Sequence, residues 1–80
     1  MYQVKNNRKL ARQLSANVCG RSAIIVDLRD ATAFIAMHGN RTQTWLKAAV
    51  AVEHADRDAC RINQATQSLE NALRTEGMLD

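Results

Sequence analysis

Proline is absent from this chain of 80 residues, and glycine, cysteine and aromatic residues are scarce, with three, two and three of each. Two cysteines exclude the disulfide framework that supports many small secreted domains. The longest apolar runs, 23–26 and 48–52, are far shorter than the roughly 20 residues that a membrane-spanning helix needs. No apolar segment follows the basic N-terminal residues, so we expect a soluble, cytoplasmic protein without a secretion signal.

Negative charge is missing from the N-terminal part of the chain. Five lysines and arginines precede the first acid, Asp27, whereas the rest of the chain carries six bases against eight acids. The formal net charge is +3. This asymmetry indicates an anionic partner, which could be nucleic acid, an acidic protein surface or a second copy of the chain.

The length predicts one small domain, 1–80. A hydrophobic core of this size seldom contributes more than a few kcal/mol, and such chains often gain stability by oligomerising. Gly20, Gly39 and Gly77 each follow a segment with helical patterning, and glycine is preferred just past a helix end. We therefore expect an all-α fold of three helices, at about 4–18, 22–38 and 42–75.

The first expected helix, 4–18, is amphipathic and basic. On a helix, four cations fall within one arc, opposite the apolar residues. A solvated charged face and a binding surface are both consistent with this pattern. If it binds, the residues that contact the partner or nucleic acid are Lys5, Arg8, Lys9 and Arg12.

The second expected helix, 22–38, has an alternative. Ser22 is a suitable N-cap, and apolar residues recur at helical spacing. The run 23–26 is β-prone, however, so 23–37 could instead form a hairpin that turns at Arg29 and Asp30. Three alanines in the second half favour the helix.

The third expected helix, 42–75, organises the chain. Its apolar residues form one stripe at heptad spacing without proline or glycine. The members of this apolar stripe are Trp45, Ala48, Val52, Ala55, Ala59, Ile62, Thr66, Leu69 and Leu73. An uninterrupted helix of this length measures on the order of 50 Å. The alternative is a break near Asp56, which would give a compact monomer of four helices.

The two shorter helices would shelter only the first half of the apolar stripe, where Phe34 and Trp45 are expected to meet. Its uncovered second half predicts a coiled-coil-like homodimer, because exposing each large apolar side chain costs about 1.5 to 3 kcal/mol. The expected self-association residues are Ala55, Ala59, Ile62, Thr66, Leu69 and Leu73.

Residues with the chemistry of a metal or catalytic site are few and widely spaced. Cys19, His38, His54 and Cys60 lack the short spacing of structural zinc ligands, and Cys60 is expected to be a packed thiol. No phosphate loop or nucleophile–base set is present. We expect no catalytic residues, no metal, no cofactor and no small-molecule substrate.

The functional prediction is a small non-enzymatic helical interaction protein (an adaptor, assembly factor or inhibitor) that self-associates and binds a macromolecular partner. The alternative is a transcriptional regulator that binds nucleic acid through the basic N-terminal helix. A helix-turn-helix around Gly39 would add Arg41 and Lys47 to the binding residues, although the turn matches that motif poorly.

Overall fold

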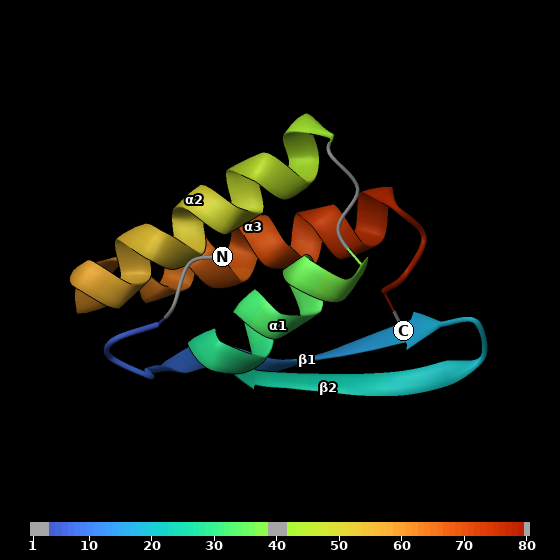
Figure 1. Cartoon of the computed structure of the whole chain (residues 1–80), viewed down its shortest axis with the longest axis horizontal. Coiled ribbons are helices and arrows are strands. Elements are labelled where there is room, and N and C mark those ends of the chain that lie inside the picture. Colours follow the sequence, from blue (N-terminus) through green and yellow to red (C-terminus); the bar gives the residue numbers. More distant parts are fainter. Residues whose placement is uncertain (1–3, 39–41, 80) are drawn as a thin grey trace.

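A computed structural model describes residues 4–38 and 42–79 of the chain. The described chain contains a β-hairpin followed by helices, so the prediction of an all-α fold is wrong (Figure 1). In chain order, the elements are β1 (Lys9–Val18), β2 (Arg21–Asp27), α1 (Leu28–His38), α2 (Gln43–Arg57), a 3-10 helix η1 (Ala59–Arg61) and α3 (Ile62–Thr75).

The segment expected to be the first helix is instead β1, paired with β2 in an antiparallel hairpin. The two-residue turn consists of Cys19 and Gly20, both at positive φ (53° and 83°), as in the type I′ turns that match the twist of a hairpin. Leu14 and Ala16 are buried, as is Ile25 on the partner strand. This alternation of buried and exposed residues has the period of a strand, so the prediction of a helix over 4–18 is wrong.

The second expected helix is half strand and half helix. Ser22, proposed as its N-cap, lies in β2, and the helix α1 begins at Leu28. Asp27 is the residue that caps α1, because its Oδ1 accepts a hydrogen bond of 2.8 Å from the Asp30 N–H. The alternative of a hairpin over 23–37 is also wrong, because Leu28–His38 form α1. The hairpin that does form pairs β1 with β2 and turns at Cys19 and Gly20.

The long third helix is interrupted at Asp58. The backbone of Asp58 is extended (φ −139°, ψ 110°). The Asp58 side chain accepts a hydrogen bond from the Cys60 N–H and so caps the start of η1. The interruption lets α3 fold back beside α2. Leu69 and Leu73 are fully buried in their own chain as a result. The expected long helix and coiled coil are therefore wrong, and the alternative break near Asp56 is confirmed.

The elements form three layers, with the hairpin below, α1 and α3 in the middle and α2 on top (Figure 1). β1 packs against α3, β2 packs against α1, and α2 packs against both of these helices. Trp45 of α2 is buried and meets Phe34 of α1 at a ring-centroid distance of 6.0 Å, as expected. Because only one face of α2 points into the core, its other face is left on the surface.

The C-terminal segment ties α3 to the hairpin. Gly77 has a positive φ of 71° and ends α3 as expected, with Met78 N–H donating to Leu73 O in a Schellman motif. The Met78 carbonyl oxygen then accepts a hydrogen bond of 2.6 Å from the Asn17 N–H on the outer edge of β1. This outer edge of the sheet is therefore partly occupied by the chain itself.

Candidate interaction groove between α2 and α3

The basic N-terminal residues do not share a helical face, because they lie on an extended segment and on β1. Arg8 donates through Nε to the Ala55 carbonyl oxygen, and Arg12 forms an ion pair of 2.8 Å with Glu70. Lys5 and Lys9 are exposed. The structure thus removes the basic helix on which the nucleic-acid prediction depended. Arg41 lies outside the described residues.

The expected self-association residues belong mostly to the core. Ala55, Thr66, Leu69 and Leu73 are fully buried within the chain, and Ile62 is partly buried. Only Ala59 is exposed. The apolar stripe was correctly identified as a buried face, but its partner is the rest of the same chain. The reason for expecting a dimer through this stripe therefore no longer holds.

Both cysteines are exposed free thiols, so the expectation of a packed Cys60 is wrong. Cys60 lies in η1, outside the core. Within residues 4–38 and 42–79, no three histidine, cysteine or acidic side chains gather as metal ligands would. No helix in this part of the chain is long and apolar enough to cross a membrane.

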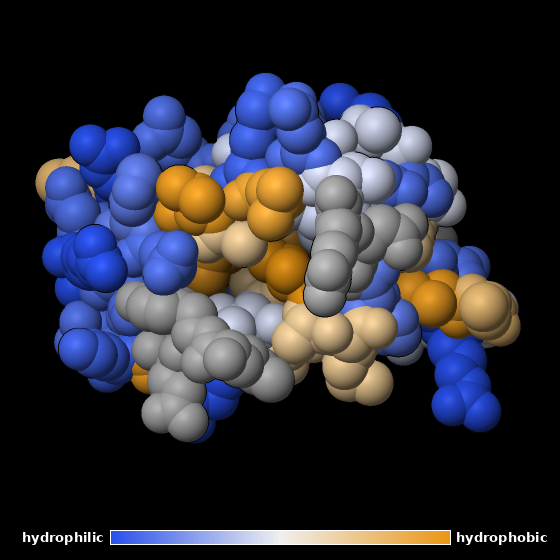
Figure 2. All heavy atoms as spheres, turned by 45° about the horizontal axis from the view of Figure 1, so that its top comes forward, coloured by the Kyte–Doolittle hydropathy of each residue, from blue (hydrophilic) through white to orange (hydrophobic). Residues whose placement is uncertain are grey.

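Exposed hydrophobic side chains instead indicate a surface on α2. Leu46 and Val50 are 58% and 47% exposed, although each is a large apolar residue. Hydrophobic atoms gather near the middle of the face that α2 crosses, with hydrophilic residues above and to the left (Figure 2). Neighbouring exposed apolar residues of this kind often mark binding surfaces.

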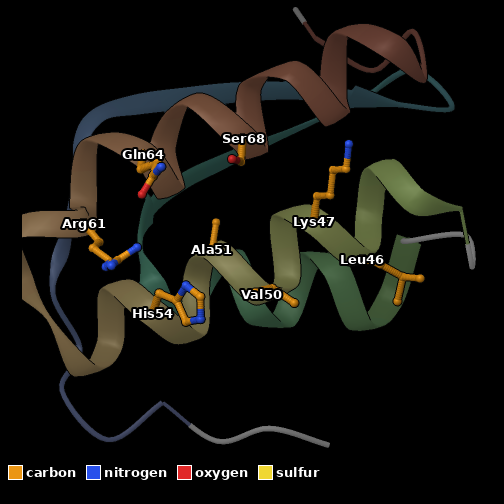
Figure 3. A pocket seen from close by; sticks show the side chains of 8 residues that line it. All are labelled: Leu46, Lys47, Val50, Ala51, His54, Arg61, Gln64 and Ser68. Atoms are coloured by element: carbon orange, nitrogen blue, oxygen red, sulfur yellow. The ribbon is translucent and has the colours of Figure 1, made fainter.

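These residues line a groove of about 520 Å³ between α2 and α3, which we call the interaction groove. In Figure 3, Lys47 and Ala51 extend from α2 toward α3, and Gln64 extends from α3 toward α2. The residues that line the groove are Leu46, Lys47, Val50, Ala51, His54, Arg61, Gln64 and Ser68.

Helical periodicity explains why the interaction groove forms. Trp45, Ala48 and Val52 point into the core, so positions 46, 50 and 54 fall on the outer side of α2, one turn apart. The small Ala51 is only partly buried beside α3. On α3, Gln64 and Ser68 are likewise one turn apart, so both walls of the groove run along the helix axes.

The charge of the interaction groove is positive. Lys47 and Arg61 line it together with His54, and no aspartate or glutamate is among its lining residues. The nearest partner of Arg61 is Asp58, at 3.8 Å between two half-exposed side chains. Such an exposed pair contributes little and leaves the guanidinium accessible to another anion.

No protein-family model matches the chain, and comparisons with curated proteins and with solved structures found no significant match. The geometry of the surface therefore carries the functional argument. Of the groove residues, only Lys47 was predicted from the sequence to bind a partner, as part of a helix-turn-helix, and His54 was named only among the widely spaced metal-ligand types. Leu46 and Val50 were recognisable as large apolar residues off the stripe, but their grouping with Arg61 depends on the fold-back of α3.

Proposed function

We propose that this chain is a non-catalytic protein-interaction module, and that the interaction groove binds an acidic amphipathic helix of a partner protein. The observation that carries the proposal is the combination of Leu46 and Val50, both exposed, with the cations Lys47 and Arg61 in one groove. A helix with apolar residues flanked by acids complements both features.

The backbone of the groove walls favours a helical occupant. The main-chain hydrogen bonds of α2 and α3 are made within each helix, so the walls offer side chains rather than free N–H and C=O groups. An extended peptide would lose hydrogen bonds to water without replacement, whereas a helix satisfies its own backbone. From residue 46 to residue 54, α2 rises about 12 Å, which matches about two turns of a partner helix.

The charges predict where the acids of the partner lie. Lys47 and Arg61 lie toward opposite ends of the groove (Figure 3). A partner helix with apolar residues at i, i+3 and i+7 and a glutamate near each end would contact both cations. The groove is shallow and its cations are exposed, so we expect a dissociation constant on the order of 1–100 μM.

A pair of synthetic peptides tests this proposal. Both carry the same apolar pattern, but one has glutamate and the other lysine at the flanking positions. Fluorescence anisotropy of the labelled peptides should show binding of the acidic one only. Val50→Asp and Arg61→Glu should each weaken binding by about tenfold or more. Met37→Asp, a matched control at an exposed residue of α1 outside the groove, should not.

Two results would contradict the proposal. One is equal binding of the two peptides, or none at millimolar concentration. The other is binding of a labelled DNA duplex that falls steeply with salt and is lost in the Lys47→Glu and Arg61→Glu variants, which would make the positive charge a nucleic-acid contact.

A further inference from the structure

The outer edge of β2 carries unpaired backbone groups among the described residues. Asn17 is opposite Ser22 in the hairpin, and its N–H points away from β2 to bind Met78 O. In an antiparallel ladder such a pair is the non-hydrogen-bonded kind, so the N–H and C=O of Ser22 also point away from the hairpin. Because every second residue of a strand directs its N–H and C=O to the same edge, these groups of Ile24 and Val26 also point away from the hairpin.

This edge is neither short nor protected by charge in its middle. Natural edge strands are usually blunted by lysine, proline or a covering element. Here the central residues are Ala23, Ile24 and Ile25, and Ile24 is 55% exposed. The one cover found in the described chain is the Asp30 carboxylate, which accepts a hydrogen bond of 3.3 Å from the Val26 N–H. The groups of Ser22 and Ile24 remain accessible.

A groove of about 200 Å³ lies between β2 and α1, beside this edge. Ile24 and Met37, which is 76% exposed, both line it. Unpaired strand groups and apolar side chains therefore occur together, which is the combination that strand addition uses.

The sequence of β2 is complementary to itself in the antiparallel direction. If two copies pair about a two-fold axis at Ile24, Arg21 of one copy lies opposite Asp27 of the other, and the two Ile24 residues are opposite each other. Opposite charges and paired branched side chains both stabilise cross-strand neighbours. The outward groups of Ile24 then form a reciprocal hydrogen-bonded pair.

We propose that β2 pairs with β2 of a second copy of this chain and forms a continuous four-stranded antiparallel sheet. The two-fold axis is perpendicular to the sheet, so both α1 helices lie on the same face, where each Met37 would be covered. This surface lies on different elements from the interaction groove and depends on different residues. It also differs from the apolar stripe, most of which is buried within each chain.

Sedimentation velocity over about 10–500 μM tests the oligomeric state. The wild-type chain should be a reversible dimer. Ser22→Pro removes an N–H that faces outward and leaves the hydrogen bonds between β1 and β2 intact, so it should weaken the dimer at least tenfold. Ile24→Lys should do the same. Leu46→Lys, a matched change at a similarly exposed residue of α2, should leave the dimer unchanged.

Cysteine cross-linking tests the register. In a background without Cys19 and Cys60, Ile24→Cys places two thiols opposite each other, with Cα atoms about 5.5 Å apart, within the range of a disulfide. Ser22→Cys is the control, because its two copies would be about 14 Å apart along the strands. Mild oxidation should therefore link the first variant and not the second.

A monomer at all concentrations would overturn this proposal and would leave the β2 edge for an extended segment of another protein. A dimer that persists in both Ser22→Pro and Ile24→Lys would also overturn it. Circular dichroism and the emission of Trp45, the one tryptophan, establish that each variant is folded. Cross-linking of both cysteine variants to the same extent would exclude the register.

Discussion

Asp56 and Asn6 lie 50 positions apart, and the Asp56 carboxylate accepts a hydrogen bond of 2.6 Å from the Asn6 backbone N–H. Its other oxygen accepts one of 2.9 Å from the Lys5 N–H, and the Asn6 side chain donates to the Asp56 carbonyl oxygen. Asp56 is 1% exposed. This buried carboxylate thus fastens the N-terminal segment to the end of α2, next to the interruption at Asp58.

We predict that Asp56→Ala lowers the free energy of unfolding by about 3 kcal/mol, because two backbone N–H groups lose a charged acceptor. Asp56→Asn keeps one acceptor oxygen and should cost roughly half as much. Urea denaturation followed by Trp45 emission measures both. A loss below about 0.5 kcal/mol in Asp56→Ala would show that these contacts do not hold the segment.

The burial of Leu69 gives a second prediction. Leu69→Ala removes a fully buried side chain and should cost about 2–5 kcal/mol, and Leu69→Asp should unfold the chain. Thermal denaturation by circular dichroism is the measurement. Folded, unchanged Leu69→Asp protein would contradict the intramolecular packing of α3.

The exposed apolar residues of α2 should be dispensable for folding. Leu46→Ala and Val50→Asp are expected to change the free energy of unfolding by no more than about 0.5 kcal/mol, because both side chains lie largely in solvent. The same urea titrations measure this. A loss comparable to that of Leu69→Ala would assign these residues to the core rather than to a binding surface.

The hairpin turn provides a fourth prediction. Cys19 is a non-glycine residue at φ 53°, and asparagine followed by glycine is the preferred pair in a type I′ turn. Cys19→Asn should therefore stabilise the chain by about 0.5–1 kcal/mol. Gly20→Ala should destabilise it by about 1–2 kcal/mol, since alanine is strained at φ 83°. Melting temperatures measure both, and an increase for Gly20→Ala would be incompatible with this turn.

Local sequence predicted the buried faces better than the elements that carry them. Trp45, Val52, Leu69 and Leu73 were correctly placed on a buried stripe, because an apolar residue every third or fourth position marks the inner face of a helix whatever covers it. Whether that cover is another chain depends on one interruption, at Asp58. The extended backbone of Asp58 and its cap on Cys60 divide the stripe between two helices, and α3 packs against α2.

The hairpin was missed for two reasons. Leu10, Leu14 and Val18 are compatible with a helix as well as with a strand, because spacing of four residues fits both periods. The turn has cysteine where asparagine or aspartate would mark a hairpin, so the usual signal was absent. The local indications were the alternation through Leu14, Ala16 and Val18 before Gly20 and the β-prone run 23–26.

The interaction groove could not be predicted from the sequence, because Arg61, Gln64 and Ser68 come close to α2 only in the tertiary fold.

The most direct test of the proposed binding is a two-dimensional ¹⁵N NMR titration of the whole chain with the acidic peptide. We predict saturable shifts at residues 46–54 and 61–68 with the acidic peptide, and none with the lysine peptide. Shifts confined to β2 and α1, or no shifts at all, would contradict it.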